Sequence, residues 1–290
     1  MKNKELRASI LLLLAAVIWG FAFVAQKVGV QYIGSFTLNG VRFALGCISL
    51  LPLIIYFNKK TKGKIELNNS KPEDVKPFAT VKAGVIMGLV LFVAASLQQI
   101  GMEETTAGKA AFITGFYIVL VPFFSIFLKH RINKNIWVAA AFAIVGLYLV
   151  SITSDFIISR GDLLELLSSF LWAVHILLID KYAKKMDALK LSFIQFATCS
   201  VLSMGFALVF ENITLNGLTQ AIVPLLYSGI ASVGIAYTLQ VFGQKHAKPS
   251  HAAIICSMES VFASIGGFII LGETMGTKGY IVVLLCLRAF

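Results

Sequence analysis

Charged residues are scarce in this chain. Of its 290 residues, only 13% are Asp, Glu, Lys or Arg, whereas soluble globular domains average about 25%. Hydrophobic residues make up 58% of the chain, and its mean hydropathy is +0.85. So few charges cannot cover the water-facing surface of a soluble domain, and we expect a polytopic membrane protein.

Cysteine is also sparse, and its spacing suggests neither a disulfide framework nor a metal site. The four cysteines all lie inside apolar segments, at Cys47, Cys199, Cys256 and Cys286. The sequence contains no GxxxxGK(S/T), HExxH or GxSxG motif, so nothing in it points to nucleotide binding, a zinc protease or a serine hydrolase. We expect neither a cofactor nor a bound metal.

Long hydrophobic runs are what the chain has instead. A membrane-spanning helix needs about 20 predominantly apolar residues, and the sequence predicts ten such spans. They lie at about residues 9–29, 36–57, 80–101, 108–128, 136–153, 163–180, 190–210, 221–243, 250–271 and 277–290. We expect the tenth, which ends in LCLRAF, to be truncated or frayed.

Basic residues gather on one side of these predicted spans. If the N-terminus is cytoplasmic, 20 of the 25 Lys and Arg residues fall on the cytoplasmic side, all except Lys27, Arg42, Lys109, Arg160 and Lys278. Because cytoplasmic loops are enriched in Lys and Arg, we expect both termini inside, a cytoplasmic loop at about residues 58–79, and an integral protein of a bacterial cytoplasmic membrane. This distribution accounts for the net charge of +11 without nucleic acid as a partner.

The two halves of the chain show weak internal similarity. A shift of 153 residues places Trp19 on Trp172, and a shift of 142 places Tyr117 on Glu259. With five spans in each repeat, the second repeat enters the membrane upside down relative to the first. We therefore expect two inverted five-helix repeats, residues 1–155 and 156–290, with a binding site at their interface.

Three segments carry a resemblance to a known family. They are AAVIWGFAFVAQKVGV in the first span, AFITGFYIVLVPFFSIFLKHRI in the fourth and SMESVFASIGGFIILGE in the ninth. The chain resembles the EamA-type transporters of the drug/metabolite transporter superfamily over nearly its whole length. The resemblance implies ten helices in two inverted repeats and the movement of small metabolites, amino acids or drugs, usually outward. Ser260 departs from the proline that the family often has after this glutamate.

Glu259 lies near the middle of the ninth span, where a charge costs roughly 3 kcal/mol on insertion scales. It shares one helical stripe with the small residues Ala252, Cys256, Ala263 and Gly266, which favours contact with protein or a water-filled cavity over lipid. Two interpretations remain open. The carboxyl either couples transport to protons, because desolvation favours its neutral form, or ties helices together, with Arg42 or Lys27 as its partner.

Seven further polar or aromatic residues are candidates for the same cavity. Trp19 and Trp172 lie deep in their spans, as core packing or as walls that stack on a solute. His175, one turn from Trp172, is either a hydrogen-bonded structural residue or a second proton carrier. Buried amides and hydroxyls need partners, which helices or a solute could provide; these are Gln99, Tyr117, Tyr237 and Gln240. Arg42 either pairs with a carboxyl or snorkels outward.

The sequence favours a secondary transporter for a small-molecule substrate, operating in the lipid bilayer by alternating access. The alternative is an intramembrane enzyme, for which Glu259 and His175 could form an acid–base pair, but no nucleophile accompanies them. The sequence does not indicate an oligomeric state.

The predicted topology can be tested by cysteine labelling from either side of the membrane. A cysteine that replaces Lys62 should react with a membrane-impermeant reagent only from the cytoplasmic side, and one that replaces Glu211 only from outside. The reverse pattern at either position would contradict the orientation.

Overall fold

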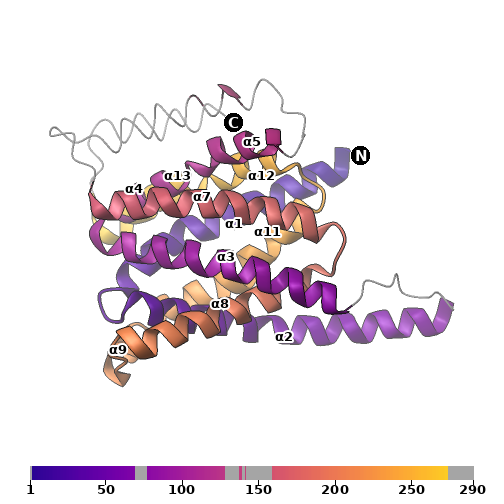
Figure 1. Cartoon of the computed structure of the whole chain (residues 1–290), viewed down its shortest axis with the longest axis horizontal. Helices are drawn as coiled ribbons and strands as arrows, with labels where there is room; N and C mark the ends of the chain where they lie inside the picture. The colour runs from indigo at the N-terminus through magenta and orange to yellow at the C-terminus, as the bar shows by residue number, and fades with distance from the viewer. Residues whose placement is uncertain (1, 69–76, 128–136, 139–140, 142–158, 274–290) are drawn as a thin grey trace.

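The computed structural model describes residues 2–68, 77–127, 137–138, 141 and 159–273. These residues form a bundle of long helices and contain no strand (Figure 1). Eight segments are long and apolar enough to cross a membrane: Lys4–Gly29, Ser35–Asn58, Phe78–Glu104, Ala107–Phe127, Arg160–Ala183, Ala188–Phe210, Ile222–Gln244 and Pro249–Leu271. They correspond to predicted spans one to four and six to nine. Predicted spans five and ten, including any truncation of the latter, lie almost wholly outside the described residues.

In the first half of the chain, three helices each run without interruption and a fourth span is broken. They are α1 (Lys2–Gly29), α2 (Ser35–Asn68) and α3 (Pro77–Glu104), followed by α4 (Ala107–Thr114) and α5 (Tyr117–Phe127). The predicted connector after residue 58 begins as helix, because α2 continues past the apolar span to Asn68 and projects beyond the bundle (Figure 1). Lysine, which occurs four times in residues 59–68, is a good helix former.

The second half begins with two uninterrupted helices, as the first does, but its eighth and ninth spans are each divided into shorter elements. They are α7 (Arg160–Ala183), α8 (Ala188–Phe210), α9 (Leu215–Gln220), α10 (Ile222–Leu226), the π-helix η1 (Tyr227–Ala236), α11 (Tyr237–Gln244), α12 (Pro249–Cys256), α13 (Glu259–Gly266) and the π-helix η2 (Gly267–Leu271). The chain leaves η2 through Gly272, which has a φ of 65°, a conformation that glycine adopts readily.

The fourth and ninth spans are interrupted in the same way. Phe116 N donates to Ile113 O at 3.1 Å, and Met258 N donates to Ile255 O at 3.2 Å, so the regular i→i−4 bond is replaced by an i→i−3 bond in both. The next two i→i−3 bonds, from residues 118 and 119 in one span and 260 and 261 in the other, also correspond. All these positions are related by a shift of 142 residues. The first residue after each interruption is Tyr117 or Glu259.

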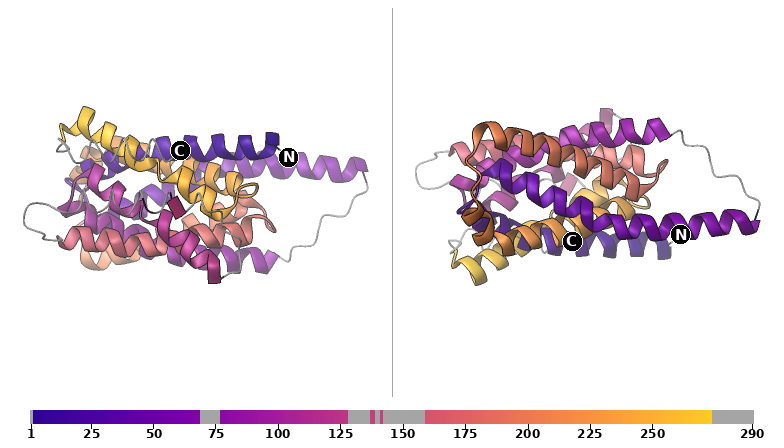
Figure 2. Two further views of the ribbon diagram at one scale, coloured as in Figure 1. Left: turned by 90° about the horizontal axis from the view of Figure 1, so that it is seen from above. Right: turned by 90° about the horizontal axis from the view of Figure 1, so that it is seen from below.

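The helices of the two halves interleave. α2 packs against α8 and η1, α3 packs against α7 and α8, and α1 packs against α13, α11 and η1. The views in Figure 2 show the segments from both halves running side by side along the bundle. The third span of each half thus packs on helices of the other half.

The outer face of the bundle is apolar. On α8, for example, Val201, Leu208 and Val209 are more than 70% exposed, which suits contact with lipid but not with water. Polar contacts are found at the helix ends instead. Glu211 accepts hydrogen bonds from Phe36 N and Thr37 N, both at 2.7 Å, and so caps the start of α2. The exposed neighbour Asn212 is therefore a better labelling position than Glu211.

Gly20 allows α1 to approach α13 closely beside Glu259. A Cβ atom at Gly20 would lie 2.8 Å from both Ala263 N and Glu259 O, and backbone atoms cannot yield as a side chain can. We expect Gly20→Ala to lower the free energy of unfolding by about 1–3 kcal/mol, measured by thermal unfolding in detergent. In the matched control Gly205→Ala, on α8, the new methyl group meets nothing within 4 Å, and equal loss of stability in the two variants would contradict this packing.

Candidate functional site

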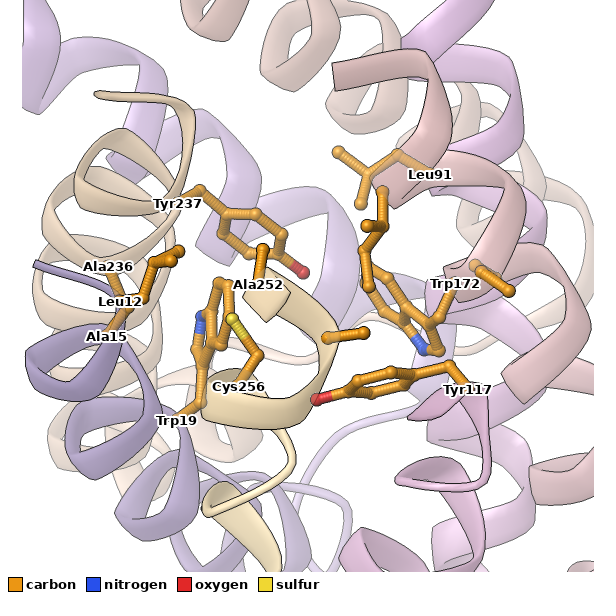
Figure 3. Close-up of a cluster of buried hydrophobic side chains, with 14 of the residues drawn as sticks. Leu12, Ala15, Trp19, Leu91, Tyr117, Trp172, Ala236, Tyr237, Ala252 and Cys256 are labelled. Carbon is orange, nitrogen blue, oxygen red and sulfur yellow. The ribbon is translucent and has the colours of Figure 1, made fainter. Parts of the chain in front are cut away.

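A cavity lies between the two halves of the bundle. Its lining comes from both halves and consists of Trp19, Phe23, Gln26, Arg42, Gln98, Thr114, Tyr117, Trp172, Ile176, Ser232, Tyr237, Gln240, Cys256 and Glu259. The cavity volume is about 40 Å³, and the empty space counted together with the solvent at the cavity opening is about 480 Å³. Figure 3 shows Trp19, Tyr237 and Cys256 facing Trp172 and Tyr117 across this region.

Three aromatic rings form a continuous wall. Tyr237 stands edge-on to Trp19, with ring centroids 4.9 Å apart, and is stacked on Trp172 at 6.1 Å. The indole Nε1 atoms of Trp19 and Trp172 are buried and have no hydrogen-bond partner among the described residues. Since a buried indole N–H usually finds a partner, both donors are available to a solute or to water.

Glu259 begins α13 and is 6% exposed. Its Oε1 accepts a hydrogen bond of 2.8 Å from Tyr117 Oη, the repeat-equivalent residue on α5. The stripe of small residues around it is buried, as predicted: Ala252, Cys256 and Ala263 are each at most 1% exposed. The structure therefore places this carboxyl inside the protein, bonded to a neutral hydroxyl.

Neither proposed cationic partner of Glu259 pairs with it. Lys27 Nζ donates to Met102 O at 2.7 Å and to Glu103 O at 3.1 Å. Arg42 donates to the side chains of Asn39 and Gln26. The suggested structural tie through Arg42 or Lys27 was thus wrong: both cations donate to uncharged acceptors instead, Lys27 to backbone oxygens of α3 and Arg42 to amide oxygens of α1 and α2.

The outcome for Arg42 itself also differs from both expectations. It neither pairs with a carboxyl nor snorkels outward, but is 2% exposed on α2 and lines the cavity. Its Nε donates to Asn39 Oδ1 at 2.9 Å and one Nη1 N–H to Gln26 Oε1, and its guanidinium carbon lies 4.9 Å from the centre of the Phe43 ring. All these neighbours are uncharged.

Six of the eight predicted site residues line the cavity, namely Trp19, Tyr117, Trp172, Tyr237, Gln240 and Glu259. Gln99 and His175 do not. Gln98 lines the cavity in place of Gln99, and since neighbouring residues on a helix point about 100° apart, Gln99 faces elsewhere. Both amide atoms of Gln99 lack a partner among the described residues.

His175 supports the aromatic wall from behind. It is fully buried, its Nε2 lies 2.9 Å from Gln195 Oε1, and its ring stands edge-on to Trp172 and Tyr237 at 5.8 and 6.3 Å. Among the described residues its hydrogen-bond partner is Gln195, whereas that of Glu259 is Tyr117. No group of three His, Cys, Asp or Glu residues that could hold a metal occurs in the part of the chain that the structure describes.

A second buried carboxyl, Glu165 on α7, was not predicted from the sequence. It is fully buried and its Oε2 accepts a hydrogen bond of 2.7 Å from the hydroxyl of Thr114, which lines the cavity. Its Oε1 has no partner among the described residues. Glu259 was selected because a charge inside a membrane span is costly, and the same argument applies to Glu165. However, Glu165 lies only two residues from the start of its predicted span.

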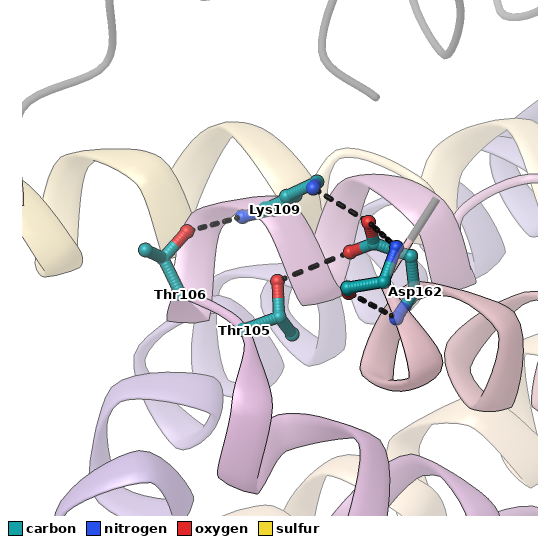
Figure 4. A network of polar contacts seen from close by, with 5 residues as sticks. Thr105, Thr106, Lys109 and Asp162 are labelled. Atoms are coloured by element: carbon teal, nitrogen blue, oxygen red, sulfur yellow. Dashed lines mark hydrogen bonds and ion pairs between the residues drawn. The ribbon is translucent and has the colours of Figure 1, made fainter. Parts of the chain in front are cut away.

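Next to Glu165, a charged network closes the end of the bundle. Asp162 is 3% exposed and accepts a hydrogen bond from Lys109 Nζ at 2.7 Å and a longer one from Thr105 Oγ1 at 3.4 Å. It also completes a capping box with Ser159 at the start of α7. Figure 4 shows these contacts joining the starts of α4 and α7.

Comparison with known proteins gives a consistent result. The sequence profile of the EamA-like transporter family matches residues 6–152 and 159–289. An uncharacterized transporter of Archaeoglobus fulgidus is 31% identical over 287 residues, which cover 99% of this chain and 85% of its own length. The uncharacterized transporter YoaV of Bacillus subtilis is 22% identical over 265 residues, covering 89% and 86%. A crystal structure of another protein superposes with a TM-score of 0.72 over 97% of this chain and 94% of that chain; its 16% identity shows similarity of fold alone.

The hydrogen bond between Thr114 and Glu165 can be tested by removing its donor. Thr114→Val keeps the shape but leaves the buried carboxyl with no described partner, and we expect a loss of about 1–3 kcal/mol in stability, measured by denaturant unfolding in detergent. The loss should be smaller when the same change is made in a Glu165→Met background. Ser125→Ala is the matched control, because the Ser125 hydroxyl is buried without a partner among the described residues and its removal should cost little. Additive effects of the two changes would contradict the pairing.

Proposed function

This chain belongs to the EamA-like transporter family, and we propose that it is a secondary transporter that moves a small organic solute by alternating access through the central cavity. It is an integral membrane protein whose described helices carry eight apolar spans. The observation that carries the proposal is the cavity itself. Aromatic walls and a few converging polar groups between two interleaved halves are the usual form of a small-ligand site in such a transporter.

We propose that the full architecture consists of ten spans in two inverted repeats, residues 1–155 and 156–290, with both termini cytoplasmic. Two findings support the repeats. The matching hydrogen-bond breaks at residues 115–116 and 257–258 are related by one constant shift, and the family profile matches the two halves separately. The orientation rests on the distribution of Lys and Arg residues.

The residues proposed to contact the solute are those that meet at the cavity from both halves: Trp19, Tyr117, Trp172, Tyr237, Gln240 and Glu259. Tyr117 and Glu259 follow the two helix breaks, where backbone groups released from regular helical bonding can serve a ligand. Rocking of one half against the other would move the two sides of the aromatic wall apart. His175 remains a buried support for the wall in this scheme.

We propose that transport is outward and coupled to proton entry through Glu259. Among the described residues it is the one carboxyl that lines the cavity, and its Tyr117 partner is neutral. The other titratable side chains of the lining are Arg42, Tyr117, Tyr237 and Cys256, whose unperturbed forms keep their charge state near neutral pH. A carboxyl that faces each side in turn can take up a proton on one side and release it on the other.

The coupling is tested with Glu259→Gln, which keeps the shape and much of the hydrogen bonding but cannot titrate. We expect folded protein that exchanges solute down its gradient between vesicles, while solute uptake into inverted vesicles no longer responds to a pH gradient. The measurement is solute flux in vesicles containing purified protein, with and without an imposed pH gradient.

The control for this experiment is Glu104→Gln. Glu104 is 43% exposed and lies 3.7 Å from Arg160 at the end of the bundle, so its neutralisation should leave coupling unchanged. If Glu259→Gln moves solute against a gradient with the pH dependence of the wild type, Glu259 is not the coupling group. If the folded wild-type protein carries no solute at all, transport itself is refuted.

A further inference from the structure

The cavity holds a cation for which the described part of the protein provides no counter-charge. Arg42 is 2% exposed and lines the cavity, yet no Asp or Glu side chain lies within ion-pair distance of it among the described residues. Its side-chain partners are the amide oxygens of Asn39 and Gln26, and the neighbouring Phe43 ring is also neutral.

Burying a guanidinium without a counter-charge costs free energy unless a further group, such as a bound anion, supplies that charge. Even after relaxation and water penetration, the penalty for burying one ion is several kcal/mol, which neutral hydrogen bonds offset only in part. Guanidinium stays protonated at any physiological pH and carries five N–H donors. The contacts with Asn39 and Gln26 use two of them, which leaves three, including both on Nη2, without an acceptor among the described residues.

The neighbours of Arg42 keep its guanidinium oriented while leaving donors free. Asn39 is itself anchored, since its Nδ2 donates to Ala95 O at 3.1 Å, and Gln26 is anchored because its Nε2 donates to Ala22 O at 3.0 Å. Both amides therefore present their oxygens to Arg42 in a fixed position. A guanidinium held in this way, with free N–H groups, is pre-organised to bind an anion.

The surroundings of Arg42 define the rest of the ligand. The same cavity is bordered by the rings of Trp19, Trp172 and Tyr237, and the two indole N–H groups have no partner in the part of the chain that the structure describes. A single guanidinium balances one negative charge and matches the two oxygens of a carboxylate. A second negative group on the ligand would meet no further cation in the described lining and would have to share the space with Glu259.

We propose that the transported solute is a small carboxylate, whose carboxylate group binds Arg42 and whose apolar or aromatic body lies against Trp19, Trp172 and Tyr237. This assignment rests on the proposed transport function and names the substrate class of the same cavity. Arg42 then serves as the anchor for the anionic end of the solute, and bound carboxylate supplies the counter-charge that the protein lacks.

The test compares carboxylates with their own primary amides, which have the same shape but lack the negative charge of the carboxylate. The probes are 3-phenylpropanoate, indole-3-acetate, 4-methylpentanoate and phenylalanine, each paired with its amide. Thermal unfolding of the purified wild-type protein in detergent is followed with each compound. We expect at least one carboxylate to raise the unfolding midpoint while its amide does not. The proposal is overturned if no carboxylate stabilises the protein, or if the amides stabilise it equally.

Variants at Arg42 connect this preference to the guanidinium. Arg42→Gln should weaken binding of the preferred carboxylate about tenfold or more, since hydrogen bonds to charged groups contribute about 1.5–3 kcal/mol, and should abolish the preference over the amide. Arg42→Lys, which keeps the charge but not the paired N–H groups, should show an intermediate loss. Arg160→Gln, at a side chain that is 76% exposed, is the matched control. If Arg42→Gln still prefers the carboxylate over the amide, the assignment is overturned. If that variant does not fold, the comparison of carboxylates with amides on the wild-type protein decides the proposal.

Counterflow in vesicles separates this inference from the transport function. Exchange of a labelled carboxylate, with little exchange of its amide, upholds both. If only amides exchange, the protein is a transporter but the carboxylate site is refuted. If carboxylates bind selectively to folded protein but no compound exchanges, the site stands and the transport function is refuted.

Discussion

Two helices of this protein lose their regular hydrogen bonding near the middle of their spans, and the arrangement of the cavity depends on that. In hydrocarbon an unsatisfied backbone group costs several kcal/mol, so a broken helix is tolerated only where protein or water surrounds it. The breaks at residues 115–116 and 257–258 are surrounded by α1, α7 and each other's spans. Each break is followed by a polar side chain, and the hydrogen bond between Tyr117 and Glu259 joins them.

The polar groups at the helix ends and those in the cavity differ in the partners that they find. At the helix ends, Asp162 meets an opposite charge on Lys109, while Glu211 and Glu273 accept hydrogen bonds from the backbone N–H groups that open α2 and α4. In the cavity, Arg42 and Glu259 have only uncharged side-chain partners among the described residues. The indole N–H groups have no partner among them. Matched charges stabilise a fold, whereas unmatched ones beside an empty space suit a ligand that arrives and leaves.

The close contact between α1 and α13 at Gly20 lies beside the cavity. Gly20 lets α1 lie directly on α13, the helix that begins with Glu259 one residue past the break. On the other side, Thr114 precedes the α4 break and bonds to Glu165. The two broken spans are thus each fixed to a helix that runs without a break, α1 or α7, and the cavity lies between these two supports.

The eight described spans, the buried stripe around Glu259 and the correspondence of Tyr117 with Glu259 could all be predicted from the sequence. Apolar length, the cost of an intramembrane charge and a constant residue shift are properties of the chain in one dimension. Which side of each helix faces inward followed only from the packing: Gln98 rather than Gln99, the neutral partners of Arg42, the place of His175 behind the wall, and the pairing of Glu165 with Thr114. The physical reason is that lipid and a protein core are equally apolar, so a membrane helix has no marked polar face from which its orientation can be read.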